Sequence, residues 1–300
     1  MYETSAGSEK ESRVGVSVVT DSTSYIPREM RDEFGIGVVA LTSVLDGVSY
    51  LDDAEDCEAF FEALAASRSF PTSSLPAVSA IEDQFESRVA KGDAVVGVFI
   101  SQRMSGTYDT AMLARDRVLE RNPGAVIEVV DGKSNSMELG FAVLAAARTA
   151  VAGGTVAEVV AAAEEMTRHT RFLFTPLTLE YLRRGGRIGG AAAVLGTILQ
   201  LKPVLTAANG ATAVAARVRS LRRAHDEIVS LFEADIREHG GLAEAYVQHA
   251  NDPVAGLRFA DRIAEVAGRP VGVLPIGPAV GTHVGPGSVG VVYQTNERMR

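Results

Sequence analysis

The chain has 300 residues, of which 46% are hydrophobic, and its formal net charge is −9. This acidic balance argues against nucleic acid or an anionic membrane surface as a partner. A single cysteine, Cys57, excludes an internal disulfide framework and favours a reducing compartment, so we expect a cytoplasmic protein. The most apolar uncharged stretch, residues 189–201, is too short to span a bilayer, so we expect no transmembrane segment.

The first half of the chain alternates short apolar runs with helical periodicity. Residues 1–13 are polar and charged, and we expect them to form a tail before the fold. The dipeptide Asp46-Gly47 predicts a hairpin between two strands. Residues 93–101 are almost entirely apolar and predict a strand buried on both faces of a parallel sheet. The pattern indicates an N-terminal α/β/α domain with a parallel sheet over residues 14–165.

The second half predicts a less regular order of elements. A short helix at 179–184 ends at Gly185-Gly186, and an apolar helix at 191–201 must be buried or face an apolar ligand. Further apolar runs and two amphipathic helices predict a second sheet with helices covering it. We therefore expect a C-terminal two-layer α/β domain with a mixed sheet over residues 166–300.

Two segments of the first domain are rich in hydroxyl groups. Thr72, Ser73 and Ser74 belong to the segment 70–77, which we expect to be a loop, and a solvated surface is its ordinary interpretation. Ser105 lies between a buried strand and the start of a helix, where free N–H groups and the helix dipole favour an anion. A simple helix cap is an equally good interpretation of Ser105.

The segment 277–290 holds five glycines and two prolines around His283. We expect a loop that places His283 and backbone N–H groups around a small polar group; the alternative is a core histidine bonded to a carbonyl. The spacing Gly285-x-Gly287-x-x-Gly290 matches the dinucleotide fingerprint, but too few residues remain for the helix and acidic residue that it requires. We predict no nucleotide site, and no metal site, because the histidines and Cys57 lack ligand spacing.

Arginines gather in two places in the second half. Arg183, Arg184 and Arg187 surround the Gly185-Gly186 turn, which is either a solvated basic turn or a contact for an anionic group or for the enzyme that acts on it. Arg219 lies near a predicted strand end, in a patch that either guides an acidic partner protein or is an ordinary surface.

Several motifs together resemble the DegV family of fatty-acid-binding proteins. They span nearly the whole chain after the tail and keep the family's order. In that order they are Val19-Thr-Asp-Ser-Thr23, Thr72-Ser-Ser-Leu-Pro76, Ser105-Gly-Thr-Tyr108, Val130-Asp-Gly-Lys-Ser-Asn-Ser-Met137, Leu179-Glu-Tyr-Leu-Arg-Arg-Gly-Gly-Arg-Ile-Gly189, Lys202-Pro-Val-Leu205 and Gly281-Thr-His-Val-Gly-Pro-Gly287.

The resemblance implies a two-domain fold with a long-chain fatty acid between the domains. It also implies a lipid-binding carrier that is not itself an enzyme and has no cofactor besides the bound fatty acid. A separate fatty-acid kinase would phosphorylate the bound carboxylate to an acyl phosphate.

The resemblance assigns site residues by their place in the motifs. The segment after Thr72 departs from the family's usual Thr-Ser-Gln-Pro-Ser, so the first carboxylate ligand is either Thr72 or Ser73. Arg219 matches an arginine that the family uses toward the kinase. The carboxylate ligands implied are Ser73 or Thr72, Ser105 and His283, with Arg187 nearby.

A serine hydrolase acting on acyl esters is the competing hypothesis, with Ser105 as nucleophile and His283 as base. It needs an acid to orient the histidine, and neither motif contains an aspartate or a glutamate. The Gly-x-Ser-x-Gly elbow is also absent, because Arg103 stands two positions before Ser105. A small-molecule sensor without any chemistry is a third possibility.

Overall fold

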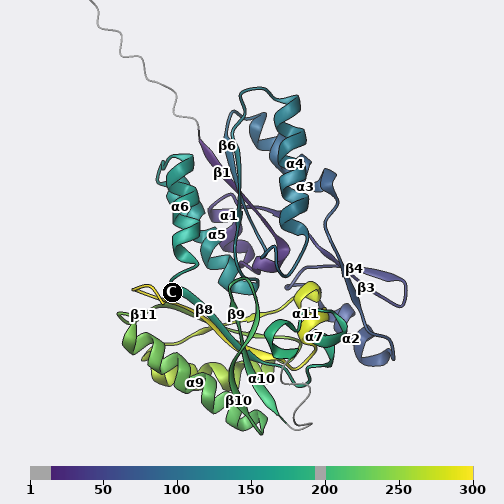
Figure 1. The fold of residues 1–300 in the computed structure, drawn as a ribbon, viewed down its shortest axis with the longest axis vertical. Coiled ribbons are helices and arrows are strands. Elements are labelled where there is room, and N and C mark those ends of the chain that lie inside the picture. Colours follow the sequence, from purple (N-terminus) through teal and green to yellow (C-terminus); the bar gives the residue numbers. More distant parts are fainter. Residues whose placement is uncertain (1–14, 193–200, 300) are drawn as a thin grey trace, which may run out of the picture.

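The computed structural model describes residues 15–192 and 201–299. The predicted tail at 1–13 and most of the predicted helix at 191–201 lie outside these residues. The upper part of the molecule in Figure 1 holds a parallel sheet, which confirms the predicted α/β class for this half. Its strand order is β2 (Gly37–Val39), β1 (Val16–Asp21), β6 (Ala94–Phe99) and β7 (Ile127–Asp131).

Helices cover both faces of the parallel sheet (Figure 1). The helices are α1 (Arg28–Glu33), α3 (Val78–Val89), α4 (Thr107–Arg121), α5 (Ser136–Val151) and α6 (Val156–Met166), and a short 3-10 turn, η1 (Ser22–Ser24), follows β1. Val19 and Val95 pack toward α3 and α4, whereas Val18 and Val96 pack toward α5 and α6. This alternation explains why the strands are apolar on both faces.

A small antiparallel sheet extends from the first unit. β3 (Thr42–Leu45) and β4 (Val48–Leu51) form the predicted hairpin around Asp46-Gly47, where both residues have positive φ. β5 (Thr72–Ser74) pairs with β3, so this part of the predicted loop at 70–77 is a strand. The pairing places Ser73 opposite Ser43. Helix α2 (Glu58–Ala66) connects β4 to β5.

The second unit is a six-stranded mixed sheet, as predicted. In order its strands are β10 (Ala211–Val218), β9 (Lys202–Ala208), β8 (Thr170–Thr175), β13 (Val289–Thr295), β11 (Leu242–His249) and β12 (Gly272–Pro275). β11 and β12 pair in parallel, and the other neighbours pair antiparallel. Helices α9 (Leu221–Glu238) and α10 (Pro253–Ala267) cover one face.

The other face of the mixed sheet is buried against the first unit. Phe172 and Phe174 on β8 belong to the same apolar cluster as Phe141 and Leu144 on α5. Leu173, between them, points to the opposite face and packs with α9. The two units therefore share one hydrophobic core across their boundary.

The segment around His283 is a short helix, α11 (Pro278–Val284), and not the predicted loop. Proline suits the first turn of a helix, because its nitrogen needs no partner there. The glycines allow close neighbours: a Cβ on Gly281 would meet the Phe61 ring at 2.8 Å, and one on Gly285 would meet the Tyr181 ring at 2.4 Å. Gly285 and Gly287 follow the helix and have a φ of +76°, so the composition reflects both a tightly packed helix and the turn after it. α7 (Glu180–Arg184), ended by Gly185 as predicted, packs against α11, whereas η2 (Gly189–Ala191) packs against β10.

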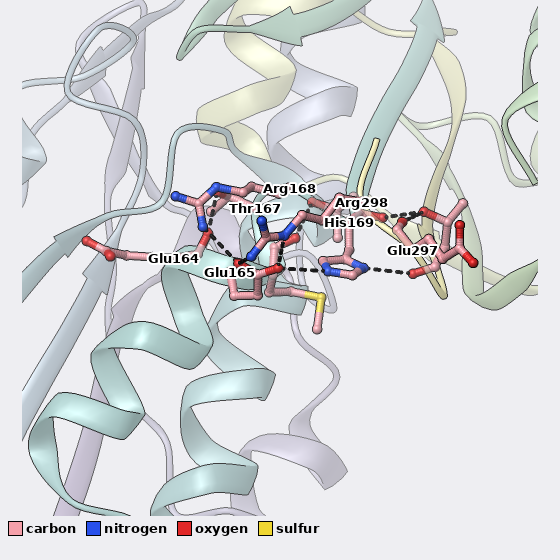
Figure 2. A network of polar contacts seen from close by, with 10 residues as sticks. Glu164, Glu165, Thr167, Arg168, His169, Glu297 and Arg298 are labelled. Carbon is pink, nitrogen blue, oxygen red and sulfur yellow. Dashed lines mark hydrogen bonds and ion pairs between the residues drawn. The ribbon is translucent and has the colours of Figure 1, made fainter. Parts of the chain in front are cut away.

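The chain passes from the first unit to the second between α6 and β8, where the C-terminal segment is fastened (Figure 2). The Glu165 carboxylate accepts hydrogen bonds from Arg168 and Arg298, and His169 Nε2 lies 3.1 Å from Glu165 Oε1. These partners, Arg298 first, lower the pKa of Glu165 to about 2. The Met299 N–H donates to the Arg168 carbonyl at 2.7 Å.

No helix among the described residues is long and apolar enough to cross a membrane.

A buried carboxylate joins α11 to the first unit. Asp52 Oδ1 accepts the Ala279 N–H at 2.8 Å and the Tyr25 hydroxyl at 3.1 Å, and Oδ2 accepts the Ser22 hydroxyl at 2.7 Å. The Tyr25 oxygen in turn accepts the Val280 N–H at 3.2 Å. Free N–H groups and the helix dipole favour a carboxylate at this position. Burial nevertheless dominates and raises the pKa of Asp52 to about 6.

We predict that Asp52 makes stability fall as the pH rises from about 4 to about 6. Its ordinary pKa is 3.8 and its folded pKa is about 6, so the folded protein keeps a proton that the unfolded chain has lost in this window. The contribution of Asp52 to the free energy of unfolding is greatest below pH 4, and it declines by about 3 kcal/mol as the pH rises through 6. Urea unfolding of the Asp52→Asn variant should lack this decline.

The exposed Asp56→Asn variant is the control and should keep the wild-type pH dependence. The same pH dependence in wild type and Asp52→Asn would contradict the assignment of this titration to Asp52.

Candidate functional site

A cavity of about 220 Å³ lies where the two units meet. The small antiparallel sheet, the mixed sheet and α11 contribute to its wall, and the lining includes both polar and apolar side chains. The apolar part includes Phe172 and Phe174, whose rings stack with centroids 4.8 Å apart. Leu41, Ile100, Leu182, Val280 and Val284 complete much of this part.

Ser73 and His283 meet at the polar part of the wall. Ser73 comes from β5 and His283 from α11, and Ser73 Oγ lies 2.9 Å from His283 Nε2. A hydroxyl pair, Ser43 Oγ on β3 and Thr282 Oγ1 on α11 at 3.0 Å, joins the neighbouring strand to the same helix. The pairing of β5 with β3 and the hydrogen bond at the start of α11 thus determine where Ser73 and His283 lie.

Ser105 reaches the cavity from the turn between β6 and α4. Its N–H donates to the Ser101 carbonyl, and its hydroxyl accepts the Thr107 N–H at 3.3 Å and lies 2.9 Å from Thr107 Oγ1. The Ser101 hydroxyl donates to the Gly210 carbonyl at 2.7 Å, so the β9–β10 turn steadies this segment. Ser105 therefore accepts a bond from the helix start and also lines the cavity.

Arg187 links the two units at the edge of the cavity. Its Nε donates to the Met104 carbonyl at 3.0 Å, and its Nη1 donates to the Gly185 carbonyl at 2.7 Å. Both partners are uncharged, and the side chain is exposed. The guanidinium charge is therefore not neutralised by either of these bonds.

His283 is uncharged at neutral pH. Burial, and secondarily the positive charge of Arg187, lowers its pKa to about 4. Its Nδ1 is buried and has no hydrogen-bond partner among the described residues. The ring therefore shares a hydrogen bond with Ser73 through Nε2, and no carboxylate among the described residues is bonded to its other nitrogen.

The structure brings four of the five expected ligands to one cavity. Ser73, Ser105, Arg187 and His283 all line it, whereas Thr72 is exposed and lies outside the lining. Of the two neighbouring hydroxyls, the position of Ser73 therefore suits a cavity ligand better than that of Thr72. Arg219 is exposed just after β10, outside the cavity.

Four polar residues of the wall were not singled out by the sequence: Thr23, Asn135, Thr206 and Thr212. Thr23 is buried and donates its hydroxyl to Asp21, and Asn135 donates to the sulfur of Met104 at 3.0 Å. Thr23 and Asn135 belong to motifs that carry the family resemblance, and their place in these motifs was the sequence signal that could have identified them as wall residues. Asn135 has a weak sulfur acceptor as partner, so its amide can also serve a polar ligand.

The geometry gives no support to a serine hydrolase. His283 is bonded to Ser73, and Ser105 is bonded to Thr107. Without an acid at His283 Nδ1 within the described part of the chain, the orienting third group of a triad is missing. Within residues 15–192 and 201–299, no group of three or more His, Cys, Asp or Glu side chains is placed to hold a metal ion.

Two α/β units that meet at a cavity lined by both polar and apolar side chains define a two-domain α/β class of protein. The family model described as "Uncharacterised protein, DegV family" matches residues 15–296. The chain therefore belongs to the DegV family.

Relatives and solved structures agree with this membership. A DegV domain-containing protein of Clostridium acetobutylicum is 39% identical over 289 residues, which cover 96% of this chain and 100% of that protein. A structure described as fatty acid binding of a DegV family protein from Thermus thermophilus has a TM-score of 0.84 and 33% identity, and covers 94% and 100% of the two chains. A stearic acid-binding protein from Eubacterium ventriosum has a TM-score of 0.85 and 25% identity, and covers 93% and 98%.

We predict that Arg187→Gln raises the pKa of His283 above about 4. Removing a nearby positive charge favours the protonated ring, but burial remains, so the pKa should stay below the ordinary 6.5. An NMR titration of the imidazole proton signals measures the midpoint directly. Arg183→Gln, on the exposed side of the same turn and paired with Glu180, should leave it unchanged. An unchanged or lower midpoint in Arg187→Gln would show that this charge does not act on His283.

Proposed function

We propose that this protein binds a long-chain fatty acid in the cavity between its units, with the carboxylate among Ser73, Ser105, His283 and Arg187. The observation that carries the proposal is the division of one cavity into hydrogen-bond donors and an apolar wall. A buried carboxylate must be hydrogen-bonded, and an acyl chain gains about 0.8 kcal/mol for each CH₂ removed from water. The fatty acids described for the Thermus and Eubacterium proteins support the same ligand class.

The charges suit reversible binding of an anion. The imidazole of His283 is neutral and is bonded to Ser73 through Nε2, so the serine hydroxyls act as neutral donors, and Arg187 supplies the positive charge from the exposed edge. A hydrogen bond to a charged group contributes about 1.5–3 kcal/mol. Binding a carboxylate beside His283 would in turn raise the pKa of the ring.

The second part of the proposal is that a separate fatty-acid kinase phosphorylates the bound carboxylate to an acyl phosphate, so this protein is a carrier and not itself the enzyme. The family resemblance is the main support. The exposure of Ser74 and Arg187, both at the cavity, gives a partner access to the polar end. Arg219 lies on the surface, where it can contact that partner.

We predict that protein purified from bacteria carries an adduct of a few hundred daltons in native mass spectrometry, and that solvent extraction releases it as a fatty acid. Ser73→Ala and Ser105→Ala should each weaken rebinding of the released acid about tenfold or more, because each loses a bond to a charged group. Thr72→Ala is the matched control, because the hydroxyl of Thr72, next to Ser73 in the chain, is exposed and lies outside the cavity. Protein that flies only at its bare mass and does not take up fatty acid would refute the proposal.

We predict that Arg219→Ala slows acyl phosphate formation by a fatty-acid kinase with ATP, while fatty-acid binding stays at the wild-type level. The reason is that Arg219 lies outside the cavity and would act only on the partner. Acyl phosphate is measured by trapping with hydroxylamine. The exposed Arg237→Ala on α9 serves as a charge-matched control. Equal rates for both variants and wild type would remove Arg219 from the kinase contact.

A further inference from the structure

His283 lies against the turn that ends α7. A Cβ built on Gly185 would lie 2.2 Å from His283 Nδ1 and 2.9 Å from its Cε1. The carbonyl oxygen of Tyr181 lies 3.1 Å from the same point. No real Cβ tolerates contacts this short, so the imidazole occupies the space where any other side chain at position 185 would begin.

The backbone of Gly185 does not itself require glycine. Its φ of −72° and ψ of −7° lie in the right-handed helical region, which any residue adopts. Gly186 differs, because its φ of +70° favours glycine for conformational reasons. Space for the ring is therefore the reason for a glycine at 185.

We propose that Gly185 is a positioning residue of the carboxylate site: the space left by its missing side chain holds the Nδ1 edge of His283 and so directs Nε2 toward Ser73. This inference rests on the proposed function only for its effect on fatty-acid binding. The effect on the ring itself exists in the protein without ligand.

The same contact determines which way the hydrogen bond runs. Nδ1 is buried without a polar partner among the described residues, whereas Nε2 has Ser73 Oγ at 2.9 Å. Buried N–H groups without an acceptor are rarer than unpaired acceptors, so the proton of the neutral ring belongs on Nε2. Nε2 then donates to Ser73 Oγ, and the Ser73 hydroxyl proton is free to donate into the cavity.

The test combines Gly185→Ala with His283→Ala. Gly185→Ala should displace the ring and weaken binding of palmitate or stearate about tenfold. In the His283→Ala background the added methyl meets no ring, so Gly185→Ala should cause little further loss there. Equal losses in both backgrounds, or wild-type affinity of Gly185→Ala, would overturn the proposal.

Gly190→Ala is the matched control from the same loop. A Cβ there would lie 3.7 Å from the nearest atom, an ordinary contact, and its φ is not positive. This variant should fold and bind like wild type. Comparable weakening in Gly190→Ala would mean that any methyl in this loop disturbs the site, and that Gly185 has no particular role.

A second readout separates this inference from the proposed function. Nitrogen-15 NMR of ligand-free protein should show His283 as the neutral tautomer with its proton on Nε2, and Gly185→Ala should change that signature. If wild type binds no fatty acid but the signature changes, the positioning role stands and the proposed function fails. A His283 signature that is the same in wild type and Gly185→Ala overturns the positioning role, whatever the protein binds.

Discussion

The hydrogen bond from the Ala279 N–H, at the start of α11, to the carboxylate of Asp52 is the interaction on which the rest of the site depends. It joins residues 227 positions apart in the chain and connects the first unit to the helix that carries His283. Val280 and Val284 of the cavity wall lie on the same helix. A carboxylate this deeply buried is tolerated because three donors and the helix dipole face it. One helix therefore supplies both polar and apolar side chains to the cavity wall.

Close approach is the second constraint around α11. Its glycines admit neighbouring rings, and Gly185 on the adjoining turn admits the imidazole of His283. Hydrogen bonds fix the direction of the helix, and the missing side chains fix its distance from the surrounding elements. A site built in this way has little freedom to adjust, which suits a cavity whose donors must converge on one small group.

The sequence predicted both sheets, the hairpin at Asp46-Gly47 and the position of Ser105 between a buried strand and a helix. These features follow from local periodicity and turn chemistry, which short segments encode. It predicted a loop around His283 because many glycines usually mean positive φ, and Gly285 and Gly287, after the helix, do have positive φ. Gly281 lies inside the helix instead, where its missing side chain admits the ring of Phe61, which is distant in sequence. The strand β5 was missed for a similar reason, since only its partner β3 makes it a strand. The Ser73–His283 contact likewise depends on tertiary placement.

The shared core under β8 changes how the boundary near residue 165 should be understood. Phe172 and Phe174 face α5, and Leu173 faces α9, so the mixed sheet is apolar on both sides. A chain cut after α6 would leave one face of that sheet, and the matching face of α5, in contact with water. The halves are thus distinct in topology yet share one hydrophobic core. Circular permutation is better placed at the exposed Asp46-Gly47 turn than at this junction.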